Sequence, residues 1–556
     1  MNLLAKRGGF RHHVRMVTPA FSDCINKLGV DEKDVIPFGR NKAKISLDVL
    51  DKPAAPGKLI LVSAITPTPS GEGKTTVSIG LAQGLQAIGK KVCLALRQPS
   101  MGPVFGRKGG ATGGGKSSLT PAEEINMHFT GDFHAITSAH NLISAIIDNA
   151  MFFHTLNIDE RKVIWKRVMD MNDRSLRSII VGLNKQGFPR ETGFDITPAS
   201  EIMACLCLAT SYKDMEERIN RIVIGFTTDD KPVFARELGI TGSVMALLKD
   251  ALMPNLVQSV EGVPCFLHGG PFANIAHGCN SIVATKAAMS CSDYVVTEAG
   301  FSADLGAEKF YDIKCRKSGL QPSLTILVAT VQGLKVQGGV DYAVVKEENV
   351  EAVEAGFENL DKHLRNIRKF GQTVIVAINR FPSDTDAEVA AIETHCRRLG
   401  VGFAVNRAFS EGGAGAEELA RLVVDTIERE PSAPLRFAYA DSDSIEEKVV
   451  KVATEIYGAT SVVFSSSARR MMQTLERNGM GHFPVCIAKT QYSFSTDPKR
   501  MGAADGFELQ VNDVIVNSGA EMIVVVAGDI LRMPGLPKKP MALNIRIKDG
   551  LIEGLS

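Results

Sequence analysis

A glycine-rich loop between an apolar strand and a helix has the residues needed to hold the phosphates of a nucleotide. The loop covers residues 66–76, and Thr68 stands where the usual pattern G-x-x-x-x-G-K-[ST] has glycine. Backbone N–H groups can curl around phosphate oxygens, Lys74 can bridge the outer phosphates, and the Thr75 hydroxyl can hold Mg²⁺. We predict nucleotide binding, in preference to a tight turn with a surface lysine, by Thr68, Pro69, Ser70, Gly71, Glu72, Gly73, Lys74, Thr75 and Thr76.

Further polar residues follow other apolar runs. Arg97 comes directly after the run 92–96, and its planar guanidinium suits a phosphate or a carboxylate. Glu298 follows the run 294–297 and can hold Mg²⁺, directly or through water, or form a buried ion pair. Five glycines in the stretch 109–115, flanked by lysines, can bring backbone amides to an anion or form a flexible loop. We expect Arg97 near Lys74, because the carboxyl ends of neighbouring strands border the ligand crevice.

Three other side chains are ambiguous from spacing alone. His128 lies in a polar cluster and His268 follows a strand, and each histidine by itself is more often structural than catalytic. Phe381 precedes a helix whose start has Thr385 and Glu388 at capping-box spacing. It can stack on a flat ligand, although a core contact is the more common outcome.

The elements that must position these residues form an α/β pattern. Residues 58–65 and 92–96 are short apolar runs without alternation, typical of strands buried on both faces, and a helical period lies between them. This βαβ unit predicts a doubly wound, mainly parallel sheet like that of P-loop NTPases, with smaller α/β domains. Further buried strands are predicted at 222–224, 263–267, 294–297, 324–330, 373–378 and 522–527.

The chain divides most naturally at the proline-rich segment 430–434. We predict a nucleotide domain at 23–360 with a mainly helical excursion at about 140–220, a smaller α/β unit at 361–435, and a C-terminal α/β domain at 436–556. Residues 1–22 carry four basic side chains before Ser22 and no acid until Asp23. A basic, unfolded leader or a start at Met16 is preferred to a transit peptide, because serine is nearly absent there.

Composition restricts the class of protein. Among 556 residues, 63 Lys plus Arg against 62 Asp plus Glu give a net charge of +1, so no global field attracts nucleic acid or an anionic membrane. No apolar run is long enough for a membrane span, and the ten cysteines contain no C-x-x-C pair. We expect a cytoplasmic protein that binds neither nucleic acid nor membrane.

Several motifs, taken in order, resemble the formate–tetrahydrofolate ligases, also called 10-formyltetrahydrofolate synthetases. The resemblance runs from about Gly39 to Leu555. Its strongest pieces are residues 66–76, 97–115, 128–132, 191–195, 271–281, 297–316, 377–385, 489–493 and 533–537.

The resemblance implies a two-step ligation with MgATP. ATP would phosphorylate formate to formyl phosphate, and N10 of tetrahydrofolate would then attack the formyl carbon. In this scheme Lys74 neutralises the transferred phosphoryl group, Thr75 binds Mg²⁺ and Arg97 holds formyl phosphate. His128 and His268 match polar positions that orient formate or assist proton movement.

The resemblance also implies a folate site and some departures from the family pattern. Phe381 and Pro382 would contact the pterin on one side, and Phe409 takes the place of the usual tryptophan on the other. Gln98 and Lys116 replace a usual glutamate and tyrosine, so either the Lys116 ammonium substitutes for a stimulating monovalent cation or it points into solvent. A homotetramer is expected from the family. Two alternatives stay open: a diverged ligase that activates another small carboxylate, and a non-catalytic P-loop switch.

Overall fold

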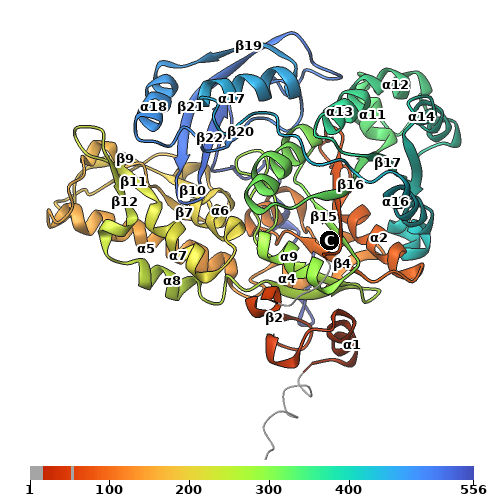
Figure 1. The fold of residues 1–556 in the computed structure, drawn as a ribbon, viewed down its shortest axis with the longest axis horizontal. Coiled ribbons are helices and arrows are strands. Elements are labelled where there is room, and N and C mark those ends of the chain that lie inside the picture. Colours follow the sequence, from red (N-terminus) through yellow and green to blue (C-terminus); the bar gives the residue numbers. More distant parts are fainter. Residues whose placement is uncertain (1–16, 52–55, 556) are drawn as a thin grey trace, which may run out of the picture.

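A large central sheet positions the candidate residues. The computed structural model describes residues 17–51 and 56–555, and its main sheet has twelve strands (Figure 1). Every neighbouring pair from β14 to β18 is parallel, whereas β1, β2 and β13 are antiparallel additions at one edge. The path is β1 (Val35–Pro37), β2 (Ala43–Ile45), β13 (Asn255–Ser259), β14 (Pro264–Leu267), β4 (Val92–Leu96), β15 (Tyr294–Glu298), β3 (Lys58–Ala64), β16 (Pro322–Ala329), β17 (Val374–Asn379) and β18 (Gly402–Asn406), with β6 (Ser117–Thr120) and β5 (Gly113–Gly114) off this path.

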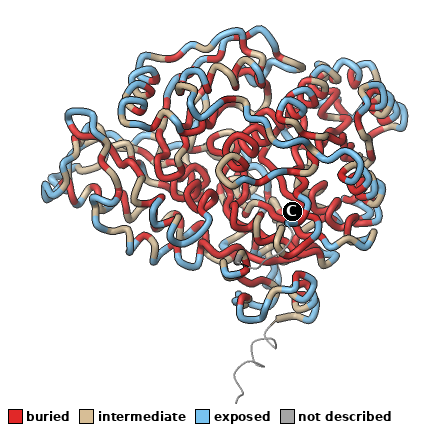
Figure 2. The backbone as a smooth tube through the Cα atoms, viewed as in Figure 1, coloured by how far each residue is buried: buried red, intermediate tan, exposed pale blue. Residues whose placement is uncertain are grey.

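Both faces of the parallel part are buried. In β3, Leu59 and Leu61 join one apolar cluster, and Ile60 and Val62 join another on the opposite face. Helices α2 (Lys74–Ala87) and α16 (Glu417–Arg429) supply residues to the second cluster, and α9 (Ile282–Cys291) and α13 (Phe357–Lys369) to the first. Burial is correspondingly dense around the sheet (Figure 2). The predicted α/β class is confirmed, and two-sided burial explains why the strand sequences do not alternate.

The order of strands differs from the order in the chain. The predicted runs at 263–267, 294–297, 324–330 and 373–378 are β14, β15, β16 and β17 of this sheet. β15 lies between β3 and β4, so the two strands of the predicted βαβ unit are not direct neighbours. The run at 222–224 instead belongs to β11 (Val223–Phe226), which forms a separate two-stranded sheet with β12 (Pro232–Phe234).

The segment after residue 131 leaves the sheet, as expected, but it is less helical than predicted. Figure 1 places its helices to one side of the central sheet. Four strands of three residues occur between residues 167 and 196, too short to produce a visible period. The segment contains α5 (Asp132–Phe152), β7 (Arg167–Met169), β8 (Ile179–Val181), β9 (Arg190–Thr192), β10 (Phe194–Ile196), α6 (Glu201–Leu208), α7 (Tyr212–Arg221) and α8 (Thr241–Leu248).

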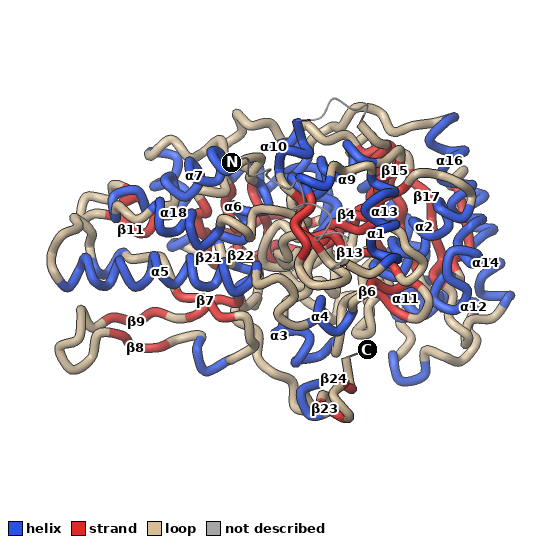
Figure 3. The backbone as a smooth tube through the Cα atoms, turned by 90° about the horizontal axis from the view of Figure 1, so that it is seen from below, coloured by secondary structure: helices blue, strands red, loops and turns tan. Residues whose placement is uncertain are grey.

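The C-terminal part has its own four-stranded sheet, coloured blue in Figure 1. The order is β19 (Ala459–Phe464), β21 (Phe507–Asn517), β22 (Met522–Ala527) and β20 (Val485–Ala488), flanked by α17 (Ile445–Val452) and α18 (Ser466–Arg477). A last hairpin of β23 (Arg546–Lys548) and β24 (Leu551–Glu553) projects from the body in Figure 3. The segment 361–435 does not form a separate sheet, because its strands β17 and β18 complete the central one.

Eight shorter or peripheral α-helices complete the described part of the chain. They are α1 (Pro19–Leu28), α3 (Met101–Pro103), α4 (Ala122–Asn126), α10 (Arg316–Ser318), α11 (Val331–Gln337), α12 (Val350–Ala355), α14 (Asp386–Arg398) and α15 (Ala408–Glu411). Most of the predicted basic leader, residues 1–16, lies outside the described residues, but its end enters α1, where Phe21 is buried. Within the described ranges, no helix combines the length and the apolar character needed to cross a lipid bilayer.

Candidate active site

The glycine-rich loop leads from β3 into α2 with the predicted geometry. Gly73, at φ 73°, precedes the first residue of α2, and a Cβ there would lie 2.3 Å from the side-chain nitrogen of Asn379. Glu72 is buried and ties the loop together: the Thr68 amide donates to its Oε1 at 2.9 Å, and the Thr330 hydroxyl donates to its Oε2. Thr68 can stand at the glycine position because its φ is not positive. Its N–H group is bonded to Glu72 and so is not the one that faces a phosphate.

Glu298 connects the two predicted anion-binding segments. It ends β15, the strand between β3 and β4. Its Oε2 accepts a hydrogen bond from the Thr75 hydroxyl at 2.9 Å, and its Oε1 accepts one from Arg97 at 3.3 Å. Arg97 also donates to the carbonyl of Pro271 at 3.3 Å. The predicted approach of Arg97 to the nucleotide loop is thus achieved through a third strand.

Gly300 provides the space for the guanidinium of Arg97. A Cβ at Gly300 would lie 2.7 Å from Nη1 of Arg97 and 2.8 Å from the Cβ of Ala273. The Nε atom of Arg97 is buried and has no hydrogen-bond partner among the described residues. A planar cation held in this way, with one donor left over, is suited to an anionic ligand.

Lys108 joins Lys74 and Arg97 in one group of cations. Burial lowers the pKa of Lys74 to about 8; Glu298 and Glu72 oppose this shift, and Arg97 and Lys108 add to it. Desolvation and then Arg97 lower the pKa of Lys108 as well, although the residue as a whole is exposed. Lys108 was not among the predicted site residues. Its position directly before the glycine run was the available signal.

We expect nucleotide affinity to fall as the pH rises through 8. A cation with a lowered pKa loses its charge at a lower pH, so Lys74 becomes neutral above about pH 8 and attracts phosphate less. Calorimetric titration with MgATP should show about tenfold weaker binding at pH 9.5 than at pH 7. Lys74→Arg, which stays protonated throughout, should remove most of this dependence; an equally steep pH dependence in that variant would contradict the assignment.

Thr75 and Glu298 fit a Mg²⁺ site. Both supply oxygen atoms, which this ion prefers, and they already lie within hydrogen-bond distance of each other. The described residues contain no group of three or more His, Cys, Asp or Glu side chains that could hold a metal by themselves. The remaining ligands would be phosphate oxygens and water, the usual arrangement for Mg²⁺ with a nucleotide.

The glycine-rich stretch 109–115 is held from both sides. The Ala111 amide donates to the side chain of Asn126 at 2.9 Å. On the other side, a Cβ at Gly114 would lie 2.9 Å from the ring of Phe409, and the Lys116 amide donates to the carbonyl of Phe409 at 2.9 Å. The absence of side chains therefore lets this stretch pack against Phe409, rather than only making it flexible.

The two predicted pterin-contacting phenylalanines emerge from adjacent strands. Phe381 follows β17 and Phe409 follows β18, and the ends of these strands pair in register at Asn379 and Asn406. Phe381 is half-buried, whereas Phe409 is 57% exposed, with its ring accessible beside the glycine stretch. Pro382 is exposed next to Phe381. The structure thus brings all three predicted residues to the carboxyl edge of the sheet.

The two predicted histidines have different surroundings. His268 is fully buried: its Nε2–H donates to the carbonyl of Ala251 at 2.6 Å, and its Nδ1 lies 2.7 Å from the Ser281 hydroxyl. Burial lowers the pKa of His268 to about 4. These contacts leave no ring nitrogen free, which favours a structural role over the predicted contact with formate. His128 is exposed, and its role stays a prediction.

The two residues that depart from the family pattern differ in how far they are buried. Gln98 is buried, and its Oε1 has no hydrogen-bond partner among the described residues. The side chain of Lys116 is exposed. Exposure favours the alternative in which Lys116 points into solvent.

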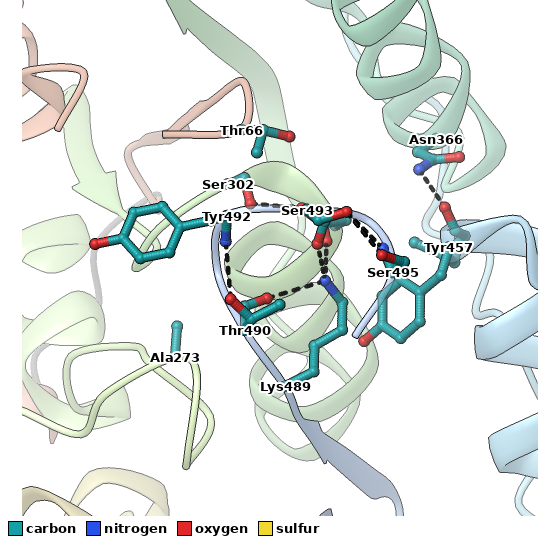
Figure 4. A network of polar contacts seen from close by, with 12 residues as sticks. Thr66, Ala273, Ser302, Asn366, Tyr457, Lys489, Thr490, Tyr492, Ser493 and Ser495 are labelled. Carbon is teal, nitrogen blue, oxygen red and sulfur yellow. Dashed lines mark hydrogen bonds and ion pairs between the residues drawn. The ribbon is translucent and has the colours of Figure 1, made fainter. Parts of the chain in front are cut away.

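A loop of the C-terminal part reaches this end of the molecule (Figure 4). Lys489 is fully buried, pairs with Asp304 at 3.0 Å, and donates to the carbonyl of Ser493 at 2.5 Å. On the same loop, Gln491 accepts a hydrogen bond from the side chain of Asn274 at 3.4 Å, three residues after the Pro271 carbonyl that contacts Arg97. The conspicuous motif 489–493 thus serves to fix a loop beside the candidate site.

Comparison with known proteins agrees with this arrangement. The sequence model of the family described as formate–tetrahydrofolate ligase matches residues 15–556. Proteins named formate–tetrahydrofolate ligase are similar over nearly the whole length: the one from Bacteroides thetaiotaomicron is 59% identical over 95% of this chain and 96% of its own. The one from Porphyromonas gingivalis is 56% identical over 94% of each chain, and the one from Maricaulis maris is 54% identical over 95% of this chain and 96% of its own.

Proposed function

Because the chain belongs to the formate–tetrahydrofolate ligase family, we propose that it makes 10-formyltetrahydrofolate, ADP and phosphate from formate, tetrahydrofolate and ATP, through formyl phosphate. The observation that carries this proposal is the hydrogen-bonded row of Thr75 at the start of α2, Glu298 at the end of β15 and Arg97 directly after β4. It joins a nucleotide loop to a second anion site. A nucleotide switch that only binds and hydrolyses ATP has no need for the second site.

The first step activates formate. Formate acylates amines poorly at neutral pH, because oxide or hydroxide would have to leave, whereas an acyl phosphate releases a stabilised anion. A formate oxygen attacks the γ-phosphorus and the bond to the ADP oxygen breaks. Lys74 neutralises charge on the phosphoryl group in flight, and such transfer depends on positioning and electrostatics more than on covalent help. Mg²⁺, held by Thr75 and Glu298, would supply further positive charge at the phosphates.

The second step transfers the formyl group. Arg97 and Lys108 hold the phosphate end of formyl phosphate while N10 of tetrahydrofolate attacks the formyl carbon. The carbon–oxygen bond to phosphate breaks, phosphate leaves, and the proton on N10 is lost to water. The positive charge of Arg97 stabilises the departing phosphate, so the same residue serves binding and departure.

Phe409 is expected to contribute strongly to tetrahydrofolate binding. Stacking of a flat heterocycle on an aromatic ring is worth about 1–3 kcal/mol, so Phe409→Ala should raise the KM for tetrahydrofolate by about tenfold with little change in the KM for ATP. Steady-state kinetics with tetrahydrofolate as the varied substrate measures this. Phe188→Ala, at an exposed ring in the segment between β8 and β9, is the control. An unchanged KM in Phe409→Ala would remove the stacking assignment.

The direct test of the proposal is an omission assay. Product is followed by the absorbance of the methenyl-folate formed on acidification, leaving out ATP, formate or tetrahydrofolate one at a time. We expect product only with all three, and ADP formation that depends on formate. Rapid ATP hydrolysis without formate would favour a nucleotide switch, and product with another small carboxylate in place of formate would favour a diverged ligase.

A further inference from the structure

We propose that Asp170 is a positioning residue for the segment 97–108, which carries both anion-binding side chains outside the nucleotide loop. This inference rests on the proposed function, since it assigns to Asp170 the task of holding Arg97 and Lys108 where formate and its phosphate meet. Asp170 itself is buried and lies in the segment between α5 and α6, outside the central sheet.

Two hydrogen bonds connect Asp170 to this segment. The Ser100 hydroxyl donates to its Oδ1 at 2.5 Å, and the Met101 amide donates to its Oδ2 at 3.1 Å. Ser100 ends the extended chain that follows β4, and Met101 begins α3. The carboxylate therefore fixes the point at which the segment turns from Arg97 toward Lys108.

Two glycines allow the segment 97–108 to pack closely against Asn172. A Cβ at Gly102 would lie 2.5 Å from Oδ1 of Asn172, and a Cβ at Gly106 would lie 2.9 Å from its Nδ2. Asn172 is buried and lies two residues beyond Asp170. The segment between Arg97 and Lys108 thus rests on residues 170–172 along its length, rather than touching them at one point.

Residues 170–172 belong to a segment that is held by other parts of the chain. Residues 167–169 form β7, which pairs with β10, and the Ile196 amide of β10 donates to the carbonyl of Arg532 at 2.8 Å. On the far side, Arg177 donates to the carbonyl of Met533 at 2.9 Å. The C-terminal chain after β22 therefore holds this segment in place. Asp170 therefore holds the glycine-bearing segment from a part of the chain that is itself fixed by hydrogen bonds.

The charge state of Asp170 matters for this role. Burial raises the pKa of Asp170 to about 6; the hydrogen bonds from Ser100 and the Met101 amide oppose the shift, and so does the charge of His128. Above about pH 6 the carboxylate accepts both hydrogen bonds. Below it, protonation removes one acceptor position, and the Met101 amide loses part of its partner.

The test compares Asp170→Asn with Asp159→Asn. Asp159 is a buried aspartate of the same excursion that caps its own turn and contacts Arg161, and it does not contact the segment 97–108. We expect Asp170→Asn to raise the KM for formate by about tenfold or more, with the Kd for MgATP changed by less than about twofold. Activity of the wild type should also fall below pH 6 in a way that Asp170→Asn does not reproduce.

This comparison and two further measurements separate the outcomes. Kinetic parameters of Asp170→Asn equal to those of Asp159→Asn, or a Kd for MgATP that rises in parallel with the KM for formate, would overturn the positioning role. If Asp170→Asn does not fold, Ser100→Ala removes one of the two hydrogen bonds and should raise the KM for formate by a smaller factor; no rise would overturn the role.

Calorimetric binding of inorganic phosphate with MgADP gives a readout independent of turnover. Wild type that binds phosphate but shows no formate-dependent product contradicts the proposed function, whereas weaker phosphate binding by Asp170→Asn still supports the positioning role.

Discussion

Replacing Lys74 with alanine is expected to lower the rate of 10-formyltetrahydrofolate formation by about 10³-fold or more, because the transferred phosphoryl group loses its nearest cation. The side chain starts α2, where Glu298 and Glu72 partly offset the lowering of its pKa by burial. Thermal stability should not decrease, since burial already disfavours this charge in the folded protein.

The experiment needs a lysine that lies outside the site. Lys91 is exposed just after the other end of α2, and Lys91→Ala should behave like wild type in kinetics and melting temperature. Lys74→Arg keeps the charge but not the shape and should retain intermediate activity. Formation of product by Lys74→Ala at more than about one tenth of the wild-type rate would exclude Lys74 from phosphoryl transfer.

Replacing Arg97 with alanine is the second change with a large expected effect. Formate-dependent turnover should fall by about 10²- to 10³-fold, whereas MgATP should still bind, because the nucleotide loop and Lys74 are unchanged. A loss of turnover without a loss of MgATP binding would distinguish the handling of formyl phosphate from nucleotide binding. The substitution also removes a partner of Glu298, whose remaining hydrogen bond comes from Thr75.

Single-turnover experiments with rapid quenching measure this effect, because they follow ADP and formyl product separately. Arg97→Lys restores the charge without the forked geometry and should recover only part of the activity. The control is Arg469→Ala, which removes an exposed arginine of the C-terminal part that pairs with Glu446. It should have no effect on turnover. Normal formyl transfer by Arg97→Ala would place the anion site elsewhere, with Lys108 as the next residue to replace.

The parts of this fold that could be predicted are those with a local signal. The apolar runs of β3, β4 and β15 lack alternation because helices cover both faces, and the glycine-rich loop has fixed spacing. The order of strands has no such signal. The insertion of β15 between β3 and β4 depends on packing across the whole sheet, and so does the contact of Glu298 with Arg97. The three-residue strand β7 was missed for the opposite reason, since it is too short to show a pattern.

The candidate site divides in the same way. Lys74, Thr75 and Arg97 could be chosen because each follows a recognisable strand or loop, whereas Lys108 and Asp170 act through contacts between distant segments. His268 shows why a strand-end position alone does not establish a contact with substrate. A histidine at a strand end in a glycine-rich context could contact a ligand. In the structure, however, the Ala251 carbonyl and the Ser281 hydroxyl occupy its two ring nitrogens.

The place of β15 between β3 and β4 also bears on how the protein is made. A ribosome releases the residues of β3 long before those of β15. β3 ends at Ala64 and β15 begins at Tyr294, roughly 230 positions later. At about 5–20 residues per second this delay is on the order of 10–50 seconds. During synthesis β3 and β4 must therefore stay apart or pair wrongly, and the nascent chain is an expected client for a chaperone until Glu298 has emerged.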